Sequence, residues 1–410
     1  MSFKIRLTIT TSLLLFSLLG SSCAPTNSLD AGLGVAVQAY RFNLIGWELQ
    51  TLSSELEQWI FGGSEKAGDE VDVVIEYFTT VERMKVLASE IEALKIGNGL
   101  GDLASLEAEL DLLQEEKESL ESTVERIIEK QIGEILAQLG IFNPIDGLIK
   151  LRINFPPVNF TLAQPPHLLV ISPKDRIESL REITLRQDIS IEEIEAIEAA
   201  VSELGVSSLV VKLGGIATYP AYVIDNANLQ FTINTAIEEW LHQYLAFKPL
   251  GFLYALDLVG ISRNYEIATM NETLAGIVSN EIGSILYQKY YSQYEMGDGQ
   301  TEVAGSDFDF NHEMREIRKA VDKYLAQGKI EQAEELMEQK RQYLASKGYY
   351  IRKLNQAYFA FHGAYADSPT SVSLIGSELK TLRDQSASLS AFLDTVAVMT
   401  GRNDLIDGIK

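Results

Sequence analysis

Two carboxylates and one imidazole stand close together in the segment Glu238-Glu239-Trp240-Leu241-His242. Glu238 and His242 are four residues apart, so on a helix their side chains lie about 40° apart and can reach one point on the same face. Glu239 lies about 100° further around the helix, beside that point. A carboxylate and an imidazole that converge in this way can bind a metal ion, and the second carboxylate can accept a proton next to it.

The segment differs by one residue from the pattern HExxH, in which two histidines bind zinc and the glutamate acts as a general base. Glu238 occupies the place of the first histidine. A third ligand must come from another part of the chain. The best candidate is Glu272, because it falls on the next expected helix, which begins near Thr269, and its small neighbours would let two helices approach closely.

Each of these residues also has an ordinary explanation. The adjacent Glu238 and Glu239 fit a solvated acidic surface, since the chain contains 58 acidic residues. Glu272 stands three residues after Thr269, which is the spacing of a capping box, and His242 fits a hydrogen-bonded core residue. The metal interpretation depends on a coincidence: the chain has only four histidines, and one of them lies at the required place in the segment that matches the pattern.

Further motifs carry a resemblance to a known family. Gly214-Gly215-Ile216-Ala217 lies upstream of the glutamate pair, Asn271-Glu272-Thr273 lies downstream, and Leu354-Asn355-Gln356-Ala357 follows later. Together with the segment 238–245, these motifs resemble the gluzincin metallopeptidases, and in particular bacterial putative aminopeptidases of that clan. The resemblance covers roughly residues 150–390.

The resemblance implies a role for each matching residue. Glu238, His242 and Glu272 would be the metal ligands, and Glu239 would be the general base. The segment from Gly214 to Ala217 would be an edge strand that pairs with an extended peptide substrate. The aromatic segment 350–366 is expected to be helical, and it supplies candidate oxyanion stabilisers, although aromatic residues at helical spacing are also typical of a core. These candidates are Tyr358, His362 and Tyr365.

The glutamate at position 238 changes the chemistry that a bound metal would have. Two histidines and one carboxylate give a divalent ion a net charge of +1, whereas Glu238, His242 and Glu272 give a net charge of zero. Water on such an ion should be less acidic. Oxygen ligands also suit Mn²⁺ better than Zn²⁺. The sequence therefore leaves three alternatives for the cofactor: zinc, manganese, or no metal.

The N-terminus has the pattern of an export signal. Lys4 and Arg6 precede an apolar stretch from about Leu7 to Leu19, and small residues follow before Cys23. This arrangement resembles a bacterial lipoprotein cleavage site, although Gly20 stands where that family has a large aliphatic residue. We expect Cys23 to carry lipid and to attach the protein to a membrane outside the cytoplasm, and simple secretion is the alternative. Cys23 is the only cysteine, so an intramolecular disulfide is impossible.

Composition excludes nucleic acid as a partner. The net charge is −24, which repels phosphate backbones. Residues 70–139 are strongly helical in pattern, and the run Gly97-Asn98-Gly99-Leu100-Gly101 interrupts them, which predicts a helical hairpin that packs on itself or associates with another copy. Its apolar residues follow heptad spacing. They are Leu103, Leu106, Leu110, Leu113, Leu120, Val124 and Ile127.

Strand and helix then alternate. The runs 167–171 and 208–211 predict buried strands, and Ser190 opens a helix with a capping box that Gly205 ends. The expected fold is α+β and predominantly helical, with a gluzincin-like core, a small sheet and a coiled-coil-like hairpin. The expected divisions are a signal peptide at 1–22, a tether and first helix at 23–69, the hairpin at 70–150, the core at 151–300 and a helical region at 301–410.

The sequence thus predicts an extracytoplasmic, membrane-anchored metallopeptidase that hydrolyses peptide bonds. The alternative is a catalytically inactive relative that binds peptides or proteins. A purely structural protein built around the heptads would be the third interpretation.

Overall fold

The computed structural model describes residues 28–42, 67–97, 101–144, 152, 154–258, 260–294, 308–366, 368 and 370–410. The predicted export signal and Cys23 lie outside these residues. Helices predominate, and the strands form two small sheets of three strands each. The prediction of a mainly helical chain with a small sheet is therefore confirmed. Among the residues described, no helix is both long and apolar enough to cross a membrane.

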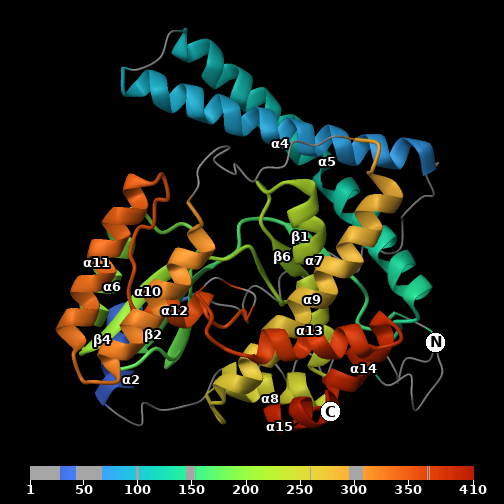
Figure 1. Cartoon of the computed structure of the whole chain (residues 1–410). Coiled ribbons are helices and arrows are strands. Elements are labelled where there is room, and N and C mark those ends of the chain that lie inside the picture. Colours follow the sequence, from blue (N-terminus) through green and yellow to red (C-terminus); the bar gives the residue numbers. More distant parts are fainter. Residues whose placement is uncertain are drawn as a thin grey trace.

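The predicted hairpin is present as two long helices, α4 (Ala67–Lys95) and α5 (Leu103–Leu139). Gly97 has a φ of +81°, which favours glycine, and Asp102 caps α5 by accepting a hydrogen bond from the backbone N–H of Ala104. The heptad residues of α5 are partly or fully buried. One end of the hairpin packs on the rest of the molecule, and the other projects beyond it (Figure 1).

The first sheet has the strand order β3-β2-β4 and is antiparallel throughout. Its strands are β2 (His167–Pro173), β3 (Arg181–Leu185) and β4 (Val206–Lys212), so both predicted strands are confirmed. Helix α6 (Ile191–Ser202) opens with the predicted capping box of Ser190 and Glu193. Apolar side chains of this sheet, α6 and α2 (Ser28–Val37) form one core.

Glu198 of α6 ties this sheet to the segment before α12. Its side chain is 4% exposed and accepts two hydrogen bonds from Arg352, at 3.0 and 2.6 Å, and one from Lys353 at 3.2 Å. The backbone N–H of Val210 also donates to it, at 2.7 Å. Burial raises the pKa of Glu198, but the hydrogen bonds from Arg352 and Val210 and the charge of Lys353 outweigh it, so the pKa is lowered.

The second sheet has the order β1-β6-β5 and supports the helices that carry the predicted ligands. Its strands are β1 (Phe160–Leu162), β5 (Gly215–Ile216) and β6 (Ala221–Val223). The helices that follow are α7 (Leu229–Leu245), α8 (Pro249–Leu258) and α9 (Tyr265–Tyr290). Both α7 and α9 start earlier than their apolar patterns predict, because Asn228 and Asn264 cap them.

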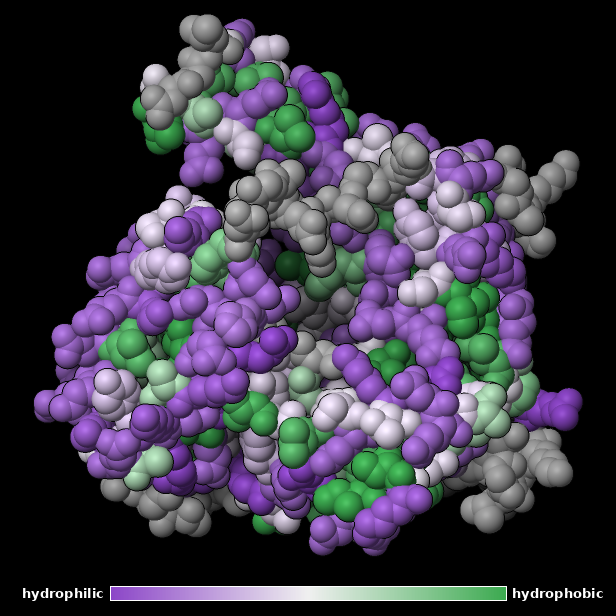
Figure 2. Space-filling view, viewed as in Figure 1, coloured by the Kyte–Doolittle hydropathy of each residue, from purple (hydrophilic) through white to green (hydrophobic). Residues whose placement is uncertain are grey.

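The C-terminal part is helical, as predicted, but the aromatic segment 350–366 forms only the short helix α12 (Gln356–His362). The other C-terminal helices are α10 (Phe310–Leu325), α11 (Ile330–Ser346), α13 (Ile375–Gln385), α14 (Leu389–Ala397) and α15 (Arg402–Gly408). Helices α10 to α12 join the first sheet, α6 and α2 in what we term the sheet lobe. Helices α7 to α9 and α13 to α15, with the second sheet and the base of the hairpin, form the helical lobe. The surface is hollowed between the two lobes (Figure 2).

Candidate metal centre

The helices α7 and α9 pack side by side and present the predicted ligands to each other. Buried residues such as Ile237, Trp240 and Leu241 hold α7 in the core of the helical lobe, and the indole N–H of Trp240 donates to the carbonyl of Pro156 at 2.8 Å. Glu238 and His242 lie on the partly exposed side of α7. Their i and i+4 spacing places both side chains on one face, as the sequence predicts.

Glu272 lies inside α9, well past its first turn. The helix begins at Tyr265 and is capped by Asn264, whose side chain accepts hydrogen bonds from the N–H groups of Glu266 and Ile267. Thr269 is a fully buried interior residue of this helix. The interpretation of Thr269 and Glu272 as a capping box is therefore wrong, because the cap lies five residues upstream.

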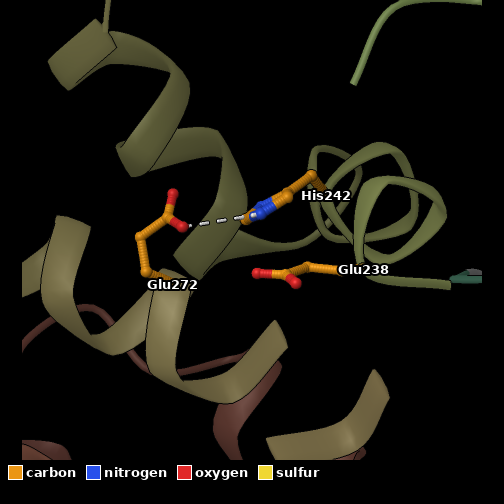
Figure 3. Close-up of side chains that lie close together, drawn as sticks. All are labelled: Glu238, His242 and Glu272. Atoms are coloured by element: carbon orange, nitrogen blue, oxygen red, sulfur yellow. Dashed lines mark ion pairs between the residues drawn. The ribbon is translucent and has the colours of Figure 1, made fainter. Parts of the chain in front are cut away.

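The side chains of Glu238, His242 and Glu272 point toward one another (Figure 3). One ligand atom from each residue lies within 4.8 Å of the other two, and His242 Nε2 is 3.8 Å from Glu272 Oε2. Two donors on one ion are at most about 4.4 Å apart, since metal–ligand bonds are about 2.0–2.2 Å long. Small side-chain movements therefore suffice to bring all three donors onto a common ion, so this cluster could hold a metal.

His242 is oriented for coordination by its neighbour on α9. The Nδ1 atom of His242 is 2.9 Å from Oδ1 of Asn271, which is fully buried. Since the amide oxygen accepts, Nδ1 carries a hydrogen, and Nε2, which faces the two carboxylates, is the nitrogen left for a metal ion. This is the tautomer that a metal requires.

Tyr254 of α8 fixes the third ligand. Its hydroxyl donates a short hydrogen bond to Oε1 of Glu272, which leaves Oε2 for the cluster. The Tyr254 ring also lies against His242, with ring centroids 5.8 Å apart. Both ligands are thus held by residues outside the ligand set. Sequence reasoning gave neither Asn271 nor Tyr254 this role, and only the position of Asn271 beside Glu272 hinted at it.

Burial and neighbouring carboxylates raise the pKa of two glutamates at this site, Glu238 and Glu239. Burial raises the pKa of Glu238 to about 7, with a further contribution from Glu272 and an opposing one from His242. Burial, Glu238 and Glu272 raise the pKa of Glu239 well above its usual value. A cation placed among these groups would relieve the repulsion and favour their charged forms. The donor set therefore fits a divalent metal ion.

Glu239 lies against the edge strand of the second sheet. A Cβ atom on Gly215 would be 2.5 Å from Glu239 Oε1 and 2.6 Å from Cγ2 of Thr235, so a side chain there would displace Glu239, Thr235 or the strand. Gly214 and Ile216 beside it are half-buried, and Ala217 is exposed. Because β5 pairs with β6 on one side only, the structure places the predicted substrate-binding segment at a sheet edge next to the predicted base.

Of the three candidate oxyanion stabilisers, Tyr365 lies by the cluster. The charge of Glu272, then burial, then Glu238 and Glu239 raise its pKa well above the usual value. Tyr358 and His362 instead pack against each other on α12, with ring centroids 4.3 Å apart and the ring planes tilted by 45°. Tyr358 packs with strand residues of the sheet lobe, and burial lowers the pKa of His362 to about 4. For Tyr358 and His362, this packing agrees with the alternative that aromatic residues at helical spacing belong to a core.

The sheet lobe contributes a carboxylate that the sequence did not predict. Burial raises the pKa of Glu182 on β3, and Glu272 and Asp257 raise it further, while a hydrogen bond from the hydroxyl of Ser179 and the charge of Arg263 oppose them. Glu182 therefore lies near enough to Glu272, Asp257 and Arg263 of the helical lobe for their charges to act on it. Its place on a different sheet, about 90 residues upstream, gives no sequence signal.

Comparison of the chain with family models, with curated proteins and with solved structures found no match. The likeness to gluzincins consequently rests on the motifs of the chain itself, and it stays a prediction.

Proposed function

We propose that this protein is a metal-dependent hydrolase that cleaves peptide bonds outside the cytoplasm, where an N-terminal lipid holds it at a membrane. The observation that carries the proposal is the convergence of Glu238, His242 and Glu272 within 4.8 Å, with Glu239 beside them and a sheet edge against Glu239.

The three ligands and their supports define what the site would bind. Glu238, His242 and Glu272 would hold one divalent cation, Mn²⁺ or Zn²⁺, and two carboxylates beside one imidazole favour the harder of the two. When bound, the ion would polarise the carbonyl of the substrate and lower the pKa of water. Asn271 and Tyr254 keep His242 and Glu272 in position.

The other residues would bind substrate and move a proton. An extended peptide would pair with the edge strand β5, which brings a backbone carbonyl next to Glu239. As the oxygen of a water molecule adds to the carbonyl carbon, a carboxylate oxygen of Glu239 accepts one proton and then returns it to the amide nitrogen as the C–N bond breaks. The Tyr365 hydroxyl would donate a hydrogen bond to the carbonyl oxygen as its negative charge develops.

Peptide cleavage tests this proposal directly. The mature protein, supplied with Mn²⁺ or with Zn²⁺, is incubated with a mixture of unstructured peptides, and products are identified by mass spectrometry. We expect cleavage that Glu239→Gln lowers by at least about 100-fold, since general base catalysis contributes 10²–10⁴-fold. A matched control, Glu192→Gln on the exposed face of α6, should cleave like the wild type.

Two results would contradict the proposal. Cleavage that survives unchanged in Glu239→Gln would exclude that residue as the base. No cleavage with either metal, combined with saturable peptide binding, would support the alternative of a peptide-binding protein without turnover.

A further inference from the structure

Exposed apolar side chains gather at one end of the helical lobe. Phe247, Phe252 and Val398, which we term the α8 patch, are 40%, 51% and 54% exposed. Phe247 and Phe252 line a concavity of about 530 Å³ together with Leu253 and Thr400. Large aromatic residues rarely gather on a surface that faces only water, so this patch indicates a binding surface.

The α8 patch is also nearly free of charge. Residues 246–258 contain only two charged side chains, Lys248 and Asp257, in a chain whose net charge is −24. Asp257 is 7% exposed and lies 3.7 Å from Arg263. The exposed Asp394 of α14 lies 3.9 Å from Lys248, so these two charges beside the patch offset each other. Aromatic residues beside a lysine suit the interfacial region of a lipid bilayer.

The length of the N-terminal segment restricts which end of the molecule can lie near a membrane. Five residue steps separate Cys23 from Ser28, where α2 begins, so a lipid on Cys23 would hold the start of α2 within about 18 Å of the bilayer. Helix α2 lies, like α8, at the end of the molecule away from the projecting hairpin (Figure 1). Its Val35 is 81% exposed.

Helix α2 carries little charge that would oppose a position near the membrane. Its one charged residue, Asp30, accepts a hydrogen bond from Arg181 at 3.2 Å.

We propose that this end of the molecule rests on the lipid bilayer, with Phe247 and Phe252 inserted among the lipid headgroups and α2 nearby. The inference rests on the lipid attachment in the proposed function, and it adds an orientation. A diacylated cysteine holds the chain to the membrane at one point only, and a second apolar contact fixes how the molecule lies on the bilayer. The tip of the hairpin between α4 and α5 then points away from the membrane, where other molecules can reach it.

A single fluorescent probe tests this orientation in the full-length protein. Cys23 is the only cysteine, and an acylated Cys23 has no free thiol, so Phe252→Cys introduces one reactive position. The variant is labelled with an environment-sensitive fluorophore and placed in phosphatidylcholine vesicles. We expect blue-shifted emission and loss of fluorescence with brominated lipid. Leu112→Cys near the hairpin tip, a residue that is 68% exposed, should show neither change.

The possible failures are distinguishable. Equal responses at residues 252 and 112, or no quenching at residue 252, would overturn the orientation, and Val398→Cys provides a second probe of the same patch. A spectral shift that depends on protein concentration without vesicles would overturn it in favour of contact between two copies. A second labelled thiol, at Cys23, would show that the lipid attachment itself is wrong, and with it the membrane-facing orientation. None of these results bears on peptide cleavage, which is measured separately.

Discussion

Replacing Asn271 should weaken metal binding although Asn271 is not a ligand. Its Oδ1 atom accepts the hydrogen bond from Nδ1 of His242 at 2.9 Å, while its Nδ2 atom is buried without a partner among the described residues. Asn271→Ala therefore removes the bond that orients the imidazole and leaves the Nδ1–H group of His242 without its acceptor. Loss of a hydrogen bond that a neighbouring residue makes to a metal ligand typically lowers metal affinity by 10–100-fold, which is about 1.4–2.7 kcal/mol of binding free energy.

The structure indicates that the loss of metal affinity in Asn271→Ala should be about 10-fold, the lower end of this range. The His242 ring also lies against Tyr254, with centroids 5.8 Å apart, so it keeps part of its orientation without the hydrogen bond. We expect about a 10-fold rise in the dissociation constant for Mn²⁺ or Zn²⁺, measured by titration against a chelator of known affinity. Asn271→Asp retains an acceptor and should restore most of the affinity.

A matched control separates this effect from a general loosening of the helix pair. Asn234 on α7, one helical turn before Glu238, donates a hydrogen bond to Asn280 on α9 at 2.8 Å and so joins the same two helices without bonding to His242. Asn234→Ala should leave the metal affinity unchanged. If Asn271→Ala binds metal as tightly as the wild type, or if both alanine variants lose affinity equally, the positioning role is refuted.

Three further predictions concern the stability and the chemistry of the protein. Glu198→Gln should destabilise the sheet lobe by about 3 kcal/mol in chemical unfolding, because it breaks buried ion pairs. Because the pKa of Glu198 is lowered in the folded protein, the stability difference between wild type and variant should be complete above about pH 5 and should shrink as the pH falls below 4.5. A stability difference that grows at low pH would contradict this. Gly215→Ala should lower kcat for peptide cleavage at least about 10-fold without loss of metal, since its Cβ would displace Glu239 or β5, whereas Gly276→Ala, which meets no atom within 4 Å, should have no effect. Glu238→His should raise the affinity for Zn²⁺ relative to Mn²⁺ in a competition assay, and an unchanged preference would show that residue 238 is not a ligand.

The parts of the fold that depend on local pattern were predictable from the sequence. The heptads and the glycine break define α4 and α5, and the capping box at Ser190 marks the start of α6. The helices α7 and α9 begin earlier than the sequence predicts, because the caps Asn228 and Asn264 add a first turn before Asn234 and Thr269.

The candidate site was predictable only where the spacing along one helix decides it. Glu238, Glu239 and His242 follow from their positions on α7. Glu272 follows from its place on the next helix and from the resemblance to a family, and its position inside α9 removes the capping explanation. Tyr254 of α8 donates a hydrogen bond to Glu272, and the charge of Glu272 acts on Glu182 of the sheet lobe. Only tertiary packing brings these residues near Glu272. Sequence periodicity predicts single helices and strands, and it does not predict contacts of this kind between separate elements.

The metal content of the purified protein tests the central claim most directly. The mature protein is equilibrated with Mn²⁺ or Zn²⁺, freed of unbound ions and measured by mass spectrometry of the metals. We predict one tightly bound ion per chain, lost in His242→Ala and in Glu272→Gln and retained in Glu192→Gln. A wild-type protein that retains neither metal, or variants that retain as much as the wild type, would contradict the assignment of Glu238, His242 and Glu272 as a metal centre.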